Sequence, residues 1–132
     1  MKILIVDDFE MIRVMLKGQL NSMGITNIDQ AKDGKEALDL IMAANSSNSL
    51  YDVVFCDWNM PVMTGIEVLE TCKAHPEIKE MPIIMVTAES ERGHVVRALK
   101  SGASDYLIKP IAPVILQKKI STLIEKLNLK SA

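Results

Sequence analysis

Four short runs of consecutive apolar residues constrain the fold of this chain more than any other feature. They occupy residues 3–6, 53–56, 83–86 and 106–108. Within them, apolar and polar residues do not alternate as they do in a strand that has one face in water. Continuous apolar runs of this length are typical of strands buried on both faces. They predict a parallel sheet with helices on both sides. A weaker fifth strand candidate lies at residues 27–31.

The segments between these runs have the length and the spacing of helices. Apolar residues recur at steps of three and four in five segments, which begin near residues 11, 37, 66, 95 and 115. Gly24 and Gly102 are expected to stop the first and fourth helices, and His75-Pro76 to end the third. We expect residues 45–49, rich in Ser and Asn, to form a surface loop. Strand and helix therefore alternate five times along the chain.

This alternation predicts an α/β fold with right-handed crossovers between parallel strands. The 132 residues suit one domain, whereas an eight-fold barrel takes roughly 250 residues. We therefore predict a single-domain, doubly wound, five-stranded parallel sheet of the flavodoxin-like type, with strand order 2-1-3-4-5 and five helices.

The charge and composition exclude several classes of protein. The net charge is −2, so no basic excess points to nucleic acid or to an anionic membrane surface. No apolar run approaches the length of a membrane span. The two cysteines, Cys56 and Cys72, form no metal or redox motif, and a reducing, cytoplasmic setting is the simplest interpretation.

Polar side chains follow the apolar runs at the point where each strand is expected to end. They are Asp7, Asp8, Asp57, Thr87 and Lys109. Since the carboxyl ends of parallel strands share one edge, and ligands bind there near the point where strand order reverses, we expect these residues to converge. Taken singly, the aspartates and the threonine could simply cap helices, and the lysine could be a solvated loop residue. The joint pattern favours a binding site.

Three carboxylates in one pocket repel each other. Two like charges 4 Å apart cost roughly 4 kcal/mol at an effective dielectric constant near 20. A hard cation such as Mg²⁺, which prefers oxygen ligands, would relieve this repulsion. Lys109 and Thr87 could bind a tetrahedral oxyanion such as a phosphoryl group. An aspartate can itself act as the nucleophile and form an aspartyl-phosphate.

Motifs for competing chemistries are missing from the sequence. It contains no P-loop, no G-x-G-x-x-G dinucleotide fingerprint and no G-x-S-x-G nucleophile elbow. His75 and His94 fall at helix ends, where we expect solvated surface residues and not ligands. Met60 and Met63 lie in the loop after Asp57, where we expect them to be partly exposed.

Four short motifs resemble the receiver domain of two-component response regulators, in the same order and spacing, over essentially all of residues 1–132. They are Ile5-Val6-Asp7-Asp8, Asp57-Trp58-Asn59-Met60-Pro61 with Gly65, Val86-Thr87-Ala88 and Lys109-Pro110. The chain looks most like the stand-alone CheY type of bacterial chemotaxis. Two segments depart from that type. Ile111-Ala112 stand where Phe-Thr is common, and Glu10-Met11-Ile12 stand where small polar residues are usual.

The resemblance implies a role for each acidic residue. Asp57 would accept a phosphoryl group from a phosphohistidine on a sensor histidine kinase. Mg²⁺ would be bound by the side chains of Asp8 and Asp57, by the backbone carbonyl of Asn59, and by Asp7 through water. Such a chain is a signalling protein that catalyses only its own phosphorylation and dephosphorylation.

The resemblance also implies a switch. Thr87 would hydrogen-bond the attached phosphoryl group, Lys109 would contact it as a counter-charge, and Tyr106 would change its burial on activation. The Lys109-Pro110 bond would be cis. We expect a monomeric receiver domain over residues 1–132 without an output domain. It would bind its target in trans, such as a component of the flagellar motor switch, and no nucleic acid or membrane.

Two alternatives are weighed against the motor-switch interpretation. The first is a phosphate carrier in a phosphorelay, which would pass the group to another histidine protein. The second is a true hydrolase that uses an aspartyl-phosphate, like the haloacid-dehalogenase phosphatases. Those enzymes need an acid/base aspartate two residues after the nucleophile, where this chain has Asn59, and usually a cap domain, for which 132 residues leave no room.

Overall fold

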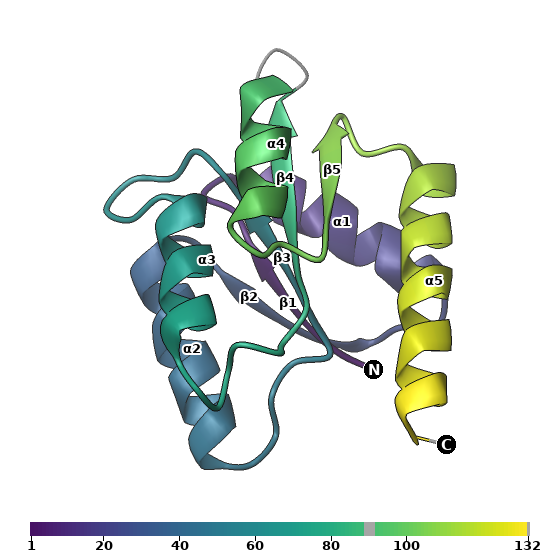
Figure 1. Ribbon diagram of the computed structural model, residues 1–132. Helices are drawn as coiled ribbons and strands as arrows, with labels where there is room; N and C mark the ends of the chain where they lie inside the picture. The colour runs from purple at the N-terminus through teal and green to yellow at the C-terminus, as the bar shows by residue number, and fades with distance from the viewer. Residues whose placement is uncertain (89–91, 132) are drawn as a thin grey trace.

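The computed structural model describes residues 1–88 and 92–131 of the chain. Within them a central parallel sheet has the order β2-β1-β3-β4-β5, as predicted (Figure 1). The strands are β1 (Lys2–Val6), β2 (Asn27–Ala31), β3 (Val53–Asp57), β4 (Ile83–Ala88) and β5 (Asp105–Lys109). All four pairings between neighbouring strands are parallel. The fold class and the strand order predicted from the sequence are confirmed.

Five helices cover the two faces of this sheet. They are α1 (Glu10–Ser22), α2 (Gly34–Ser46), α3 (Gly65–Ala74), α4 (Arg92–Lys100) and α5 (Pro113–Ser131). Buried residues of α1 and α5 form one core with one face of the sheet, and those of α2, α3 and α4 form a second core with the other (Figure 1). No helix of the described residues is long and apolar enough to cross a membrane.

The two cores explain the runs of consecutive apolar residues in the inner strands. Successive side chains of a strand point to opposite faces of the sheet. In β3, Val53 and Phe55 belong to the core under α1 and α5, whereas Val54 and Cys56 belong to the core under α2 and α3. All of these side chains are at most 1% exposed, so an inner strand needs an apolar residue at each position that lies in either core.

Local signals set most helix ends. Thr64 and Glu67 form a capping box at the start of α3, and Asp33 caps α2 by accepting a hydrogen bond from the Glu36 backbone N–H. Gly24 and Gly102 follow α1 and α4 in the left-handed backbone region, as expected of helix stops. The predicted surface loop at 45–49 is shorter than expected, because α2 continues through Ser46.

The loop between β3 and α3 departs from expectation at one methionine. Met60 is only 7% exposed and packs into the core under α2 and α3, so its predicted exposure is wrong. Met63 is half-buried, as predicted. Between them, Val62 has a φ of 70° and is 82% exposed. A β-branched residue is disfavoured in this left-handed region, and its exposed side chain gains little packing in return.

We expect Val62→Asn to raise the free energy of unfolding by about 0.5–1 kcal/mol, because asparagine tolerates the left-handed conformation better than valine. Urea unfolding followed by circular dichroism measures the change. Val14→Asn is the matched control, since Val14 is also exposed but lies within α1, where we expect no gain. An unchanged or lower stability of Val62→Asn would contradict the assignment of strain to this residue.

Candidate functional site

The carboxyl ends of three strands bring one lysine between two buried aspartates. Asp7 follows β1, Asp57 is the last residue of β3, and Lys109 is the last residue of β5. The Lys109 ammonium lies 2.9 Å from Oδ2 of Asp7 and 3.1 Å from Oδ1 of Asp57. The two aspartate side chains are only 4% and 8% exposed. The convergence predicted from strand topology is therefore present for these three residues.

Backbone hydrogen bonds fix Asp7 in place. Its Oδ1 accepts from the Phe9 N–H at 2.9 Å, and its own N–H donates to the Ala31 carbonyl at 3.1 Å. The Arg13 guanidinium donates to the Asp7 carbonyl at 2.7 Å, a contact that the sequence analysis did not anticipate. Asp7 thus holds the backbone of Phe9, the residue that precedes α1, and also pairs with Lys109.

Asp8 completes a group of three carboxylates. Ligand oxygens of Asp7, Asp8 and Asp57 all lie within 4.8 Å of one another, and of the three residues only Asp8 is exposed. An oxygen-only donor set with this charge fits a hard divalent cation and suits neither a soft nor a borderline metal. Asn59 lies two residues beyond Asp57 and is exposed. The structure therefore provides a site that could bind a metal ion.

Burial, repulsion between carboxylates and the positive charge of Lys109 together set the pKa values at the site. Burial, followed by the charge of Asp7, raises the pKa of Asp57 to about 6, although Lys109 acts in the opposite direction. Burial by itself would lower the pKa of Lys109, but its hydrogen bond to Asp7 and the charge of Asp57 outweigh this and raise it. Lys109 is therefore a fixed positive charge beside a carboxylate that protonates unusually easily.

The backbone around Asp57 is tightly packed. The Trp58 N–H donates to the Val86 carbonyl at 3.0 Å, and the Gly65 N–H donates to the Trp58 carbonyl at 2.9 Å. A Cβ atom at Gly65 would overlap the carbonyl oxygen of Asp57. Only glycine lets the start of α3 approach the end of β3 this closely, which explains why Gly65 belongs to the motif.

Thr87 lies beside this group, on the neighbouring strand. Asp57 pairs in register with Val86, so Thr87 is one residue further toward the site. It is 2% exposed and lies within β4, not after its end as the sequence analysis expected, because pairing with β5 continues to Ala88. Its Oγ1 is 3.3 Å from Nδ1 of His94, a hydrogen-bonding distance.

Tyr106 lies further from the carboxylates, on β5. It pairs in register with Met85, and Thr87 pairs with Ile108, so Tyr106 and Thr87 are offset by two positions along the two strands. The phenol ring is half-buried, and the ammonium of Lys119 from α5 lies 4.8 Å from its centre. The position is on the outer strand next to α5, as the sequence analysis expected.

The prediction that His94 is a solvated surface residue is wrong. Its ring stacks on Trp58 with a centroid separation of 3.9 Å and an interplanar angle of 7°. The contact depends on tertiary structure: α4 packs over Trp58, directly after β3, so that His94 shields the Trp58 ring, which is only 5% exposed. His75 does lie at the end of α3, where its Nδ1 accepts from the Glu77 N–H at 3.2 Å.

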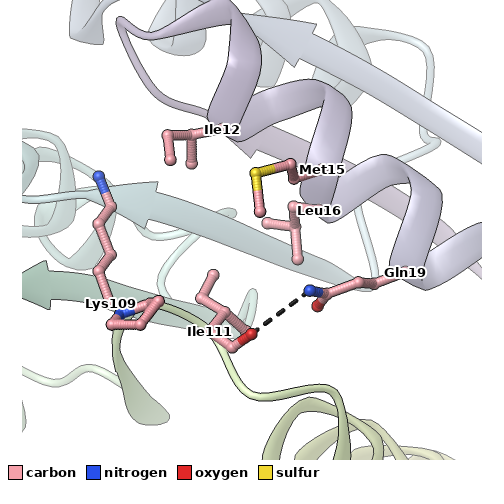
Figure 2. A pocket seen from close by; sticks show the side chains of 7 residues that line it. Ile12, Met15, Leu16, Gln19, Lys109 and Ile111 are labelled. Carbon is pink, nitrogen blue, oxygen red and sulfur yellow. Dashed lines mark hydrogen bonds between the residues drawn. The ribbon is translucent and has the colours of Figure 1, made fainter.

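On its other side, Lys109 borders a small apolar hollow between α1 and the segment that leads into α5 (Figure 2). Its volume is about 50 Å³, and Ile12, Met15 and Leu16 of α1 face Ile111 across it. The Gln19 amide N–H donates to the Ile111 carbonyl at 3.3 Å. The Lys109-Pro110 peptide bond in this segment is cis, which confirms that prediction.

Comparisons with known proteins agree with this geometry. The family model described as "Response regulator receiver domain" matches residues 3–121. The chain belongs to the response regulator receiver domain family. As a receiver domain it is a signalling protein, and the family that the four sequence motifs predict is confirmed.

Individual relatives match nearly the whole chain. The chemotaxis protein CheY of Pseudomonas aeruginosa is 40% identical over 128 residues, which are 97% of this chain and 99% of the relative. The structure of the REC domain of AraT, a response regulator from Geobacillus stearothermophilus, has a TM-score of 0.84 and 28% identity, with 99% of this chain and 98% of that chain covered. The chemotaxis response regulator CheY4 of Vibrio cholerae has a TM-score of 0.77 and 34% identity, with 92% and 97% covered.

Because its pKa is raised, the charged Asp57 should lower the free energy of unfolding in metal-free buffer, and this effect should depend on pH. Its ordinary value is 3.8 and its folded value is about 6, so between these values the folded chain binds the proton more tightly than the unfolded chain. The contribution of Asp57 to the free energy of unfolding therefore falls as the pH rises through this range. We expect Asp57→Asn to be more stable than the wild type by about 1–3 kcal/mol near pH 7, and this difference to shrink towards pH 4.

Urea unfolding in a chelating buffer at several pH values measures this difference. Asp39→Asn is the control, because the Asp39 side chain is 69% exposed and its charge should matter little at any pH. A difference between Asp57→Asn and the wild type that stays constant from pH 4 to pH 7 would contradict the assignment of the raised pKa.

Proposed function

We propose that this chain is a phosphorylation-dependent switch of bacterial chemotaxis that accepts a phosphoryl group on Asp57 from a sensor histidine kinase. The observation that carries the proposal is the buried Asp57 carboxylate, held 3.1 Å from the Lys109 ammonium and next to two further aspartates. The similarity to chemotaxis proteins named CheY supports the chemotaxis assignment.

The chemistry follows from the residues at the site. An oxygen of Asp57 attacks the phosphorus of a phosphohistidine. The P–N bond breaks, and its electron pair returns to the imidazole, which then takes up a proton. Lys109 stays charged throughout and offsets the negative charge of the transferring group. Attack by water later releases inorganic phosphate and restores the carboxylate. The chain would catalyse only these two steps on itself.

We also propose that Mg²⁺ is the cofactor. The side chains of Asp8 and Asp57 and the backbone carbonyl of Asn59 would hold it, with Asp7 acting through water. When bound, the ion supplies positive charge for the carboxylates and for the phosphoryl oxygens. Asp7 already accepts hydrogen bonds from Phe9 and Lys109, which supports an indirect role for it, whereas Asp8 is exposed.

Activation would be read out on the face made by α4, β5 and α5. Thr87 would donate its hydroxyl to the phosphoryl group, and Tyr106 would change its burial in response. A groove of about 350 Å³ lies on this face, lined by Tyr106, Ile108, Ile115 and Lys119 among others. Ile108 is 38% and Ile115 46% exposed. Exposed apolar side chains of this kind mark partner surfaces, and we propose that a flagellar motor switch component binds here.

The phosphodonor would dock on a different surface. Phe9, Met11 and Met15, which lie in or next to the first turns of α1, are 65%, 74% and 53% exposed. Met15 also lines the hollow beside Lys109, so this apolar surface adjoins the site that a phosphohistidine must reach (Figure 2). The same surface would accept a histidine phosphotransfer protein, which keeps a phosphorelay carrier as the second candidate function.

We propose that the chain is a monomer. We also propose that it works in the cytoplasm, since Cys56 and Cys72 are both buried and free and need no oxidising compartment. Comparing the affinity of the phosphorylated chain for a motor-switch peptide with its affinity for a histidine phosphotransfer protein would separate the two candidate functions.

Incubation with acetyl phosphate and Mg²⁺ tests the acceptor. We expect the wild type to gain one phosphoryl group, detected by intact-mass spectrometry and removed by hydroxylamine. Asp57→Asn should gain none, because an amide is not a nucleophile for this reaction. Asp39→Asn, which changes an exposed aspartate on α2, should behave as the wild type. The assignment is wrong if Asp57→Asn is phosphorylated as fully as the wild type.

A Mg²⁺ titration tests the order of importance of the other two aspartates. Binding should change the fluorescence of Trp58, which adjoins Asp57. We expect Asp8→Ala to weaken Mg²⁺ binding by about tenfold or more, since it removes a direct ligand, and Asp7→Ala to weaken it less. Equal affinities of the two variants would refute this ordering.

A further inference from the structure

Three side chains link the phosphoacceptor strand to α4. Trp58 directly follows Asp57, and its ring lies flat against the imidazole of His94, 3.9 Å away and 7° from parallel. Nδ1 of the same imidazole lies 3.3 Å from Oγ1 of Thr87. Trp58 directly follows β3, and Thr87 lies near the end of the neighbouring strand β4. His94 therefore contacts Trp58 with its ring face and Thr87 with its ring edge.

The Trp58 ring on which His94 stacks is held in place from more than one side. Trp58 is 5% exposed, and its backbone is tied to β4 and to the start of α3 by the hydrogen bonds described above. Arg97, one turn after His94 on α4, lies 5.9 Å from the centre of the Trp58 ring and forms an ion pair with Glu70 of α3 at 3.6 Å. The stack with Trp58 fixes the plane of the His94 ring, and within that plane Nδ1 is the ring nitrogen directed at Thr87.

We propose that His94 is a positioning residue that accepts a hydrogen bond from Thr87 in the unphosphorylated chain and so holds this hydroxyl toward α4. The inference rests on the proposed function, in which Thr87 donates to a phosphoryl group on Asp57. A threonine hydroxyl carries one proton, and a neutral imidazole nitrogen without a proton is an acceptor. Thr87 therefore donates either to His94 or to the phosphoryl group, but not to both.

This competition makes the His94 contact part of the switching equilibrium. A hydrogen bond that exists in only one of two states favours that state by its own free energy. Removing it should favour the state in which Thr87 faces Asp57, and tighten the binding of a phosphoryl mimic by the same factor. A hydrogen bond of ordinary strength corresponds to roughly three- to tenfold in an equilibrium constant.

Two substitutions separate the hydrogen bond from the ring stack. His94→Phe keeps an aromatic ring over Trp58 and removes the acceptor. His94→Asn loses the ring and keeps a polar atom close to the position of Nδ1. The probe is beryllofluoride, a tetrahedral mimic of a phosphoryl group, titrated into the Mg²⁺-saturated protein by isothermal calorimetry. We expect His94→Phe to bind it roughly three- to tenfold more tightly than the wild type, and His94→Asn to remain within about twofold.

A purely structural role of His94 predicts the opposite pattern: His94→Phe would bind beryllofluoride like the wild type, and His94→Asn would bind it differently. This result would overturn the proposal. Thermal unfolding of each variant verifies that it folds. A second measurement needs no substitution: ¹⁵N chemical shifts of the wild type should show His94 with its proton on Nε2. A proton on Nδ1 in the neutral ring would equally overturn the proposal.

The same titration with Thr87→Val distinguishes this inference from the proposed function. Thr87→Val should weaken beryllofluoride binding, and adding His94→Phe to it should have no further effect, since the hydroxyl is gone. If Thr87→Val binds like the wild type, the proposed contact of Thr87 is wrong. If Thr87→Val weakens binding but His94→Phe changes nothing, only the role of His94 is wrong. Absence of phosphorylation on Asp57 would refute the function itself.

Discussion

The Lys109 ammonium between Asp7 and Asp57 is the interaction on which the rest of this site depends. Two carboxylates that are almost fully buried repel each other strongly, and burial alone already penalises their charged forms. In the described structure Lys109 is the cation that touches both. It comes from β5, which is separated from β3 by β4. Neighbouring strands lie about 4.8 Å apart, so β5 and β3 are separated by roughly 10 Å. The long side chain of Lys109 bridges much of this distance and brings its ammonium to Asp57.

The sequence predicted those parts of the site that the sheet itself determines. Asp7, Asp57 and Lys109 follow or end apolar runs, and parallel strands buried on both faces have one possible edge at which such residues meet. Gly65 could be assigned from its motif, and the structure supplies the reason, because a larger residue would overlap the backbone of Asp57. Strand order was also accessible, since the alternation of strands and helices leaves few topologies.

The residues that sequence reasoning misplaced depend on how helices dock onto the sheet. His94 lies near the start of a helix, where a polar ring is usually solvated, and only the packing of α4 over Trp58 leaves it half-buried. Met60 is in a loop by sequence but fills the core beside α3. Arg13 binds a backbone carbonyl, a kind of contact that has no sequence pattern. For His94 and Met60 the deciding neighbours are distant in the sequence, and periodicity carries no information about them.

The separation of the interior into two cores has a consequence for how such a chain can vary. Phe55 and Cys56 are adjacent in sequence, yet they belong to different cores on opposite faces of the sheet. Side chains in the two cores meet only through the hydrogen-bonded strands between them, which resist displacement. Changes of volume under α1 and α5 should therefore combine additively with changes under α2 and α3. The α1 surface rests on one core alone, whereas the face made by α4, β5 and α5 rests on both. Substitutions in the core under α2, α3 and α4 can therefore reshape the second surface over evolutionary time while the first stays as it is.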